Sequence, residues 1–189
     1  MFLKSRLSTL IPTINFVLKF PGMKVLLRID DDTFVNVPGF LDYWHKNFEG
    51  SDDVILCESK LKAPVQRSGQ WAVTAEEYAG DMFDFPHCFG WFAAISPNLI
   101  TKMHAEARKL PFFWIDDVFM YGMVPKAIGN VKFPSGKNIF LKDGENEYRL
   151  CLVANGRGCH WLASIARPIL FDRLLAWKDR CPCPTLLGH

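Results

Sequence analysis

Three consecutive carboxylates, Asp30, Asp31 and Asp32, follow directly after the apolar run Val25–Ile29. A short, nearly continuous apolar run is typical of a strand buried on both faces in an α/β sheet, and ligands bind beyond the carboxyl ends of such strands. Three adjacent negative charges are costly without a positive partner. A hard divalent cation that carries substrate phosphates on its open positions is the usual partner for such a group.

The triplet has other interpretations, because Asp is also common in solvated turns and at helix N-caps. A calcium-binding loop is excluded, because it requires Gly and Glu where this chain has Val35 and Leu41. A phosphatase with a strand followed by Asp-x-Asp is a rival class, with Asp30 as nucleophile and Asp32 as acid. That class also needs a later, more widely spaced acidic pair.

A second acidic site, Asp116-Asp117, follows the apolar run Phe112–Ile115. No further carboxylate occurs in Val118–Gly122, which disfavours the phosphatase. Either aspartate could cap the helix that begins near Val118, and the other is then available for catalysis. A carboxyl held by apolar walls has a raised pKa, which suits a general base.

Composition excludes several classes of protein. The chain has 189 residues, about half of them apolar and 14% aromatic, which is enough for one domain with a sizeable core. The net charge of +2 and the absence of a basic run give no support to nucleic-acid binding. Six cysteines suit either a secreted domain with bridges or an intracellular protein with free thiols.

The N-terminal part is predicted to be an amphipathic helix over Met1–Phe20, followed by a turn into the acidic strand. Its most apolar stretch, Leu10–Phe20, is too short and too polar for a membrane span and lacks the pattern of a signal peptide. A doubly wound sheet needs strands before this point, so we expect a domain that is cut at its N-terminus. From Cys181 onward we expect a loose tail.

Further elements follow from local signals. Asn36 is expected to cap a helix that begins near Pro38, ends at Gly50 and buries Phe40, Leu41, Trp44 and Phe48. Ser96-Pro97 is expected to start a second helix with a buried stripe of Leu99, Ile100, Met103, Ala107 and Leu110. Strands are expected at 54–57, 131–133 and 150–153, and a last helix from Pro168. The loop 59–70 carries Lys60, Lys62 and Arg67, which either approach a diphosphate or are solvated.

Five segments together resemble the beta-1,3-galactosyltransferase family, which also holds beta-1,3-N-acetylglucosaminyltransferases and is related to the fringe enzymes. They occur in the family's order, and the resemblance covers roughly 19–129. The segments are Leu27–Asn36, Trp71-x-Val73-x-x-x-Glu77-Tyr78, Pro86-x-Cys88-x-Gly90, Ile95-Ser96 and Ile115-Asp116-Asp117-Val118-Phe119-x-x-Gly122.

The resemblance implies a GT-A fold, a Rossmann-like α/β glycosyltransferase domain over residues 1–180 that lacks its first strands. It implies an inverting Golgi enzyme that uses a UDP-sugar donor, Mn²⁺ and a glycan acceptor. The transferred sugar is galactose or N-acetylglucosamine, and the product is a beta-1,3 linkage. The resemblance also implies a membrane anchor in the full-length family form, and we expect this anchor to lie outside the present chain.

The resemblance also assigns roles to residues. Asp30 and Asp32 are the first and third residues of the Asp-x-Asp motif. Asp32 is the expected direct metal ligand. Asp30 is expected to lie toward the uridine and ribose of the donor, with Asp31 beside it. Asp117 matches the catalytic base of the family's Glu-Asp-Val motif, in which Asp116 replaces the usual Glu. From the position of the pair between an apolar run and a helix, we expect Asp116 mainly to orient Asp117 and to cap the helix.

Trp71 and Tyr78 lie near the donor or acceptor sugar or belong to the core, and Gly90 belongs to the same binding region. His160 is the candidate for a late metal-ligating histidine. In the Golgi lumen, Cys88 is expected in a disulfide, with Cys151 or Cys159 as the preferred partner and the connectivity open.

A non-enzymatic alternative is an inactive fragment or pseudoenzyme of the same family, because the resemblance leads us to expect that the N-terminal half that holds uridine lies outside this chain. The segment after Cys88-x-Gly90 also departs from the family pattern. Where the family has a further Gly and an aromatic residue, this chain has Trp91, Phe92 and Ala93.

Overall fold

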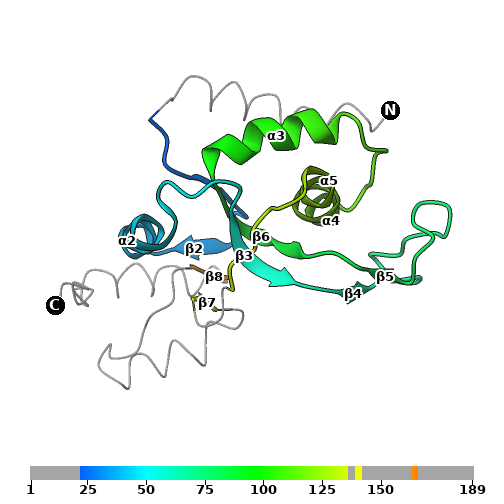
Figure 1. The fold of residues 1–189 in the computed structure, drawn as a ribbon. Helices are drawn as coiled ribbons and strands as arrows, with labels where there is room; N and C mark the ends of the chain where they lie inside the picture. Colours follow the sequence, from blue (N-terminus) through cyan, green and yellow to red (C-terminus); the bar gives the residue numbers. More distant parts are fainter. Residues whose placement is uncertain (1–21, 136–138, 142–162, 166–189) are drawn as a thin grey trace, which may run out of the picture. The chain divides into compact units, whose positions relative to one another are not determined.

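The computed structural model describes residues 22–135, 139–141 and 163–165, drawn in colour in Figure 1. The chain divides into two compact units. The described residues of the first unit are 22–28 and 50–135, and those of the second are 29–49, 139–141 and 163–165. The Asp116-Asp117 pair therefore lies in the first unit and the aspartate triplet in the second.

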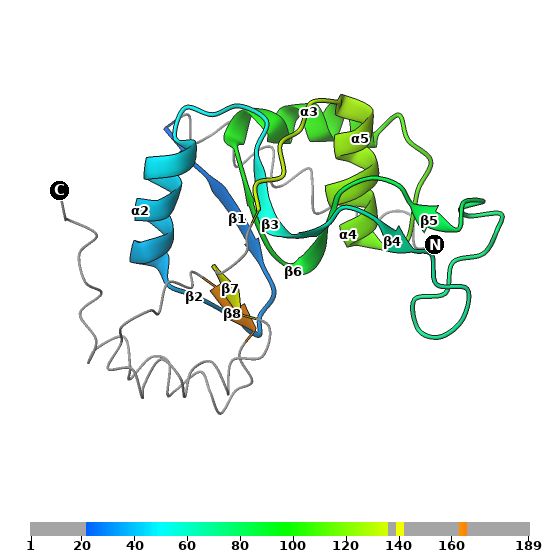
Figure 2. The ribbon, with the colours of Figure 1, turned by 60° about the horizontal axis from the view of Figure 1, so that its bottom comes forward.

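The first unit is built on a three-stranded sheet in the order β1-β6-β3. Its strands are β1 (Leu26–Ile29), β6 (His87–Ile95) and β3 (Ile55–Lys60), and β3 pairs antiparallel with β6. A short hairpin, β4 (Ala63–Pro64) with β5 (Met82–Phe83), connects β3 to β6 (Figure 2). β6 is therefore the strand that both neighbours share.

The strand before the triplet is present, but the expectation that it is buried on both faces is wrong. Its first residues are only partly buried, and the side chain of Ile29 is 46% exposed. Among the described strands, β1 lies at the edge of its sheet and has only β6 as a neighbour. A continuous apolar run therefore does not distinguish an edge strand from a central one.

The pairing of β3 with β6 contains an uneven bulge. Cys57 pairs with Ala93 and Ser59 pairs with Cys88, so Glu58 faces four residues of β6. This geometry brings Cys57 and Cys88 together in a disulfide, with their Cα atoms 5.7 Å apart. The expectation that Cys88 is bridged is confirmed, but the preferred partners were wrong, because the disulfide joins Cys88 to Cys57 on the neighbouring strand. Cys151 and Cys159 lie outside the described residues.

Helix α3 (Pro97–Ala107) begins after Ser96, as the Ser-Pro pair predicts. Four residues of its predicted stripe, Leu99, Ile100, Met103 and Ala107, are buried. Leu110 was wrongly included, because the helix ends at Ala107 and Leu110 is only partly buried. The hydroxyl of Ser96 does not cap the helix. It accepts a hydrogen bond from the Val54 N–H at 2.9 Å and donates one to the Val54 carbonyl at 3.3 Å, so it ties the helix to the segment before β3.

A second helical segment begins at Asp116. It consists of α4 (Asp116–Val118), a π-helical turn η1 (Phe119–Met123) and α5 (Val124–Ile128). α4 and η1 contact β6, and α5 contacts α3 (Figures 1 and 2). The core of the unit lies among these elements and includes Ile55, Ile95, Leu99, Met103 and Val124.

The second unit contains β2 (Thr33–Val35), α2 (Val37–Phe48), β7 (Phe140–Leu141) and β8 (Ala163–Ile165). Its strands run in the order β2-β8-β7, with β2 antiparallel and β7 parallel to β8. As expected, Asn36 caps α2, and its side chain accepts a hydrogen bond from the Gly39 N–H at 3.3 Å. Phe40 and Trp44 are buried, whereas Leu41 is 48% exposed and was wrongly assigned to the buried face.

The α/β class is confirmed in its coarse form, as a mixed fold with small sheets. A Rossmann-type sheet does not appear among the described strands. The predicted helix over 1–20, the strand at 150–153, the helix from 168 and the tail from 181 lie outside the described residues. No helix within the described part is long and apolar enough to cross a membrane.

Candidate functional site

Asp117 is positioned by an extended segment that alternates between core and solvent. Phe113 and Ile115 are buried, whereas Phe112 is 49% exposed. Ile115 then forms the N-cap of α4, so both aspartates fall in the first helical turn and neither is the cap. The prediction that Asp116 caps the helix is therefore wrong, because Ile115 occupies the N-cap position. The Asp117 carboxylate accepts a hydrogen bond at 2.8 Å from the Val118 N–H.

The two neighbouring carboxylates have different surroundings. Asp116 is exposed, whereas Asp117 is only partly exposed. Burial raises the pKa of Asp117, and the negative charge of Asp116 raises this pKa further. The hydrogen bond from the Val118 N–H and the charge of His87 lower it, but the net shift is upward. This is the direction expected for a carboxyl held by apolar walls, and it suits a general base.

Gly90 on β6 lies directly against Asp117. A Cβ at this position would be 3.4 Å from Asp117 Cβ and 3.6 Å from its Oδ2, and 3.7 Å from Nη1 of Arg28 on β1. The Asp117 carboxylate and the Arg28 guanidinium, which come from two different elements, therefore both lie near Gly90. Gly90 is the only glycine among the four bulged residues of β6. A larger residue would fill the space beside the carboxylate.

The π-helical turn presses against the start of β6. A Cβ on Gly122 would lie 2.6 Å from a Phe85 ring carbon and 2.9 Å from His87 Cβ, closer than side chains pack. Only glycine permits this contact, which explains the glycine five residues after Asp117. A π-turn inside a helix is frequent at functional sites.

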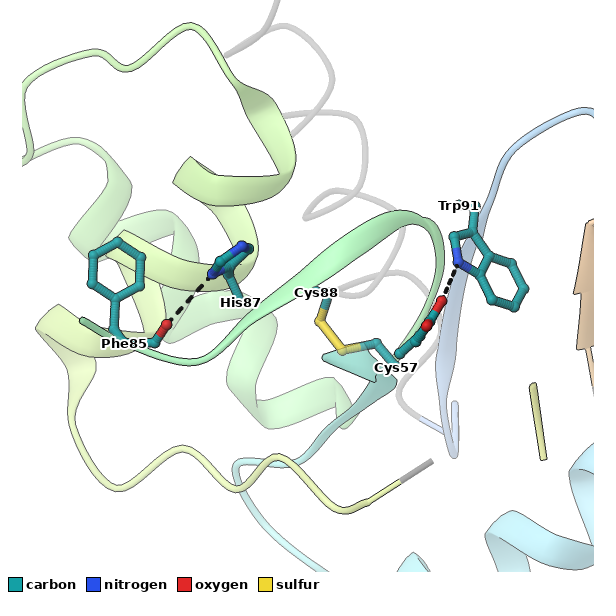
Figure 3. Close-up of a disulfide and its surroundings, with 6 residues drawn as sticks. Cys57, Phe85, His87, Cys88 and Trp91 are labelled. Atoms are coloured by element: carbon teal, nitrogen blue, oxygen red, sulfur yellow. Dashed lines mark hydrogen bonds between the residues drawn. A yellow bond between two sulfur atoms is a disulfide. The ribbon is translucent and has the colours of Figure 1, made fainter. Parts of the chain in front are cut away.

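His87 is a buried histidine beside this turn. Its exposed fraction is 6%, and its Nδ1 lies 3.4 Å from the Phe85 carbonyl oxygen (Figure 3). Burial lowers the pKa of His87, although the Phe85 carbonyl and the charge of Asp117 act in the opposite direction. His87 and Asp117 therefore influence each other electrostatically from two adjacent elements.

The aromatic residues Trp91 and Phe92, which follow Cys88, stabilise the bulge between β3 and β6. Trp91 is 6% exposed and its indole N–H donates to Glu58 Oε2 at 3.1 Å, across the same bulge that the disulfide closes (Figure 3). Phe92 is fully buried. The bulky residues that distinguish this segment from the family pattern, Trp91 and Phe92, are therefore buried next to Gly90 in the sequence.

The loop between β4 and β5 is organised by Arg67. Its guanidinium donates hydrogen bonds of 2.8–3.1 Å to the carbonyls of Val73, Thr74, Tyr78 and Gly80. Two reciprocal hydrogen bonds also join Thr74 and Glu77. The Thr74 N–H donates to the Glu77 carboxylate, and the Glu77 N–H donates to the Thr74 hydroxyl. Arg67 thus acts on its own loop, and Lys60 lies over the Phe89 ring at 4.8 Å.

Two tryptophans stack between this loop and the segment before α4. The ring centroids of Trp71 and Trp114 are 6.0 Å apart, and the planes are inclined by 14°. Trp71 remains 49% exposed. Tyr78, by contrast, packs against the rings of Phe83 and Phe113, so it contributes to the core.

The aspartate triplet forms a tight turn in the second unit. The Thr33 N–H donates to the Asp30 carbonyl at 3.1 Å, and Asp31 and Asp32 are exposed. Exposed carboxylates in a turn can give two oxygen ligands to a hard cation that keeps phosphates and water as its other ligands. Within the described residues no three possible ligand side chains cluster, and His160 lies outside them.

In the first unit the structure brings Asp117 and Gly90 together, and it stacks Trp71 on Trp114, three residues before Asp117. Sequence reasoning missed Arg28, His87 and Trp114 as their neighbours. Arg28 belongs to the quoted segment Leu27–Asn36, His87 occupies the unspecified position of Pro86-x-Cys88, and Trp114 belongs to the apolar run Phe112–Ile115. Only the pairing of β1 and β6 and the stacking of the loop reveal them.

Known proteins resemble the chain in the same region. The sequence profile of the galactosyltransferase family matches residues 4–132. A lactosylceramide 1,3-N-acetyl-beta-D-glucosaminyltransferase of Homo sapiens is 28% identical over 136 residues, which are 70% of this chain and 35% of the relative. Beta-1,3-galactosyltransferase 9 of Homo sapiens is 25% identical over 161 residues, 84% of this chain and 41% of the relative. The chain thus spans less than half the length of either relative.

Proposed function

The chain belongs to the galactosyltransferase family, and from this premise we propose that it forms part of an inverting hexosyltransferase. The proposed reaction moves galactose or N-acetylglucosamine from a UDP-sugar to a glycan hydroxyl, in beta-1,3 linkage. The names of the two human relatives support this reaction class.

The observation that carries the proposal is the environment of Asp117. This carboxyl is partly buried, its pKa is raised, and it faces a glycine on the neighbouring strand. A proton acceptor needs a pKa nearer the working pH than that of an ordinary aspartate, and it needs space for the group that gives up the proton. Asp116 is exposed and contributes mainly through its charge.

In the proposed step, the acceptor hydroxyl attacks the anomeric carbon on the face opposite the UDP leaving group. The O–H bond breaks and its proton goes to Asp117, a C–O bond forms, and the bond from the anomeric carbon to the diphosphate oxygen breaks. One displacement inverts the configuration. No covalent intermediate is required, so no serine or cysteine nucleophile is needed.

The donor diphosphate is assigned to the turn at Asp30, Asp31 and Asp32. Asp32 and Asp30 would hold the metal, for which Mn²⁺ is the proposed identity, and His160 is the candidate third ligand. When bound, the metal would supply positive charge for the departing UDP. Trp71 and Gly90 are assigned to the sugar-binding region. The proposed compartment is the Golgi lumen, where oxidising conditions suit the Cys57–Cys88 disulfide.

Paired kinetics on Asp117→Asn and Asp116→Asn test the proposal. Asn keeps the size and one acceptor oxygen but cannot take the proton. Asp117→Asn should lower kcat roughly a hundredfold or more, with UDP affinity nearly unchanged, and Asp116→Asn should have a milder effect. The assay is UDP release with Mn²⁺ and a glycan acceptor.

Two outcomes would contradict the assignment. If Asp116→Asn were inactive and Asp117→Asn nearly normal, the roles would be reversed. If both variants kept turnover, the mechanism would be wrong. A wild-type chain that binds UDP without transferring sugar would instead favour the alternative, an inactive member of the family.

A further inference from the structure

We propose that the stacked pair Trp71–Trp114 is a platform for the acceptor glycan, on which a pyranose ring next to the reacting sugar packs. The inference rests on the proposed function, because it names the substrate that Asp117 would deprotonate. It adds Trp114 to the site, and it assigns Trp71 to the acceptor rather than to the donor.

The pair combines stacking with exposure. The two rings are nearly parallel, with 6.0 Å between centroids, so they stack with an offset. Half of Trp71 nevertheless stays exposed, although burying a large aromatic side chain would stabilise the fold. Scattered exposed aromatics are normal on proteins. The distinguishing feature here is that a second tryptophan supports the exposed one.

The loop that carries Trp71 is held in place. Arg67 bonds four carbonyls of the loop, and the reciprocal bonds of Thr74 and Glu77 close its following turn. The Ala72 N–H also bonds the Gly69 carbonyl across Trp71. A rigid tryptophan offers contact area at a low entropic cost on binding, which is the property that a recognition surface needs.

Trp114 couples the platform to the proposed base. It precedes Asp117 by three residues, and its neighbours Phe113 and Ile115 are anchored in the core. Three residues of chain span at most about 10 Å. The platform therefore lies within reach of a glycan whose terminal hydroxyl meets Asp117.

The chemistry favours a sugar ring of the acceptor. One face of a pyranose is lined by C–H groups, which pack well against the negative face of an aromatic ring. The uracil of the donor could also stack on an aromatic ring. The donor, however, is assigned to the carboxylates at Asp30–Asp32, whereas Trp114 belongs to the segment that positions the base, and the base acts on the acceptor.

The test compares Trp71→Ala with Trp71→Tyr, with Leu61→Ala as a control that removes an exposed apolar side chain (73% exposed) elsewhere in the unit. Binding of lactose, N-acetyllactosamine and UDP is measured by ligand-observed NMR without a sugar donor, so that no transfer can take place. Trp71→Ala should weaken disaccharide binding roughly tenfold, a loss typical of one aromatic contact. Trp71→Tyr should keep most of the affinity, and UDP binding should not change.

Several outcomes would overturn the platform: no disaccharide binds the parent protein, the disaccharides bind Trp71→Ala as tightly as the parent, or only UDP binding is lost. Because binding is measured without turnover, the two proposals fail separately. Glycan binding that depends on Trp71 in a chain without transferase activity would support the platform and refute the proposed function. Thermal melting of each variant shows whether it is folded.

Discussion

Cys57 on β3 and Cys88 on β6 are joined by a disulfide at a bulge where one residue of β3 faces four residues of β6. The bulge carries Gly90, which lies against Asp117. The bridge therefore fixes the part of the sheet that packs against the proposed base. A disulfide across adjacent strands is consequently a structural support of the site.

Removing this bridge should destabilise the protein. For a separation of 31 residues, the loss of loop closure in the unfolded chain predicts that Cys57→Ser lowers the free energy of unfolding by about 3–4 kcal/mol. Chemical denaturation with and without reductant measures the effect. Peptide mapping that finds Cys88 joined to Cys151 or Cys159 would contradict the assigned pairing.

Gly122→Ala should be destabilising although alanine is the better helix former. The helix propensity gain is about 1 kcal/mol. The added Cβ, however, would lie 2.6 Å from a Phe85 ring carbon and 2.9 Å from His87 Cβ. Overpacking of this kind costs about 1–3 kcal/mol, so the net change should be a loss of stability. Gly22→Ala, whose Cβ would meet nothing within 4 Å, is the control for thermal melting.

Arg67→Ala should loosen the loop that carries Trp71. The variant loses hydrogen bonds to four carbonyls, which are then left to water. Amide exchange over 66–80 should become faster by at least tenfold, and limited proteolysis should cut there first. Lys62→Ala, an exposed basic residue near the same loop, is the control. Unchanged exchange in Arg67→Ala would show that the guanidinium does not order the loop.

Asp32→Asn should remove metal-dependent donor binding without unfolding the protein. The side chain is exposed in a turn, so its loss leaves the core intact. Calorimetry of UDP with Mn²⁺ should show a loss of at least tenfold in affinity, and thermal melting without metal should be unchanged. Normal Mn²⁺-dependent binding by the variant would refute the metal assignment.

Local signals predicted local structure well. Asn36 and Ser96 mark the starts of α2 and α3, and four residues of the α3 stripe are buried as its spacing predicts. What sequence could not predict depends on contacts between distant residues. The Cys57–Cys88 disulfide depends on a shift in the register between β3 and β6. The approach of Gly90 to Asp117 depends on how β6 packs against α4. The hydrophobicity of Val25–Ile29 likewise gave no information about its place at a sheet edge.

The last prediction concerns the charge of Asp117 and the stability of the fold. Because burial raises the pKa of this carboxyl, the folded state binds its proton more tightly than the unfolded chain does. Below the unfolded pKa, about 3.9, Asp117 is protonated in both states. As pH rises through the folded pKa, the fold must carry a partly buried charge, and the stability of the protonated form is lost.

Asp117→Asn keeps the shape and removes the charge, so the variant should be more stable than the wild type at neutral pH. The difference should shrink as the pH falls and should vanish near the unfolded pKa. Urea denaturation at a series of pH values measures it, and Asp116→Asn, at an exposed position, should show a smaller effect. A variant less stable than the wild type at neutral pH would mean that the carboxylate stabilises the fold. A gain in stability together with lost turnover is instead the pattern of a charge that is retained for catalysis at the expense of stability.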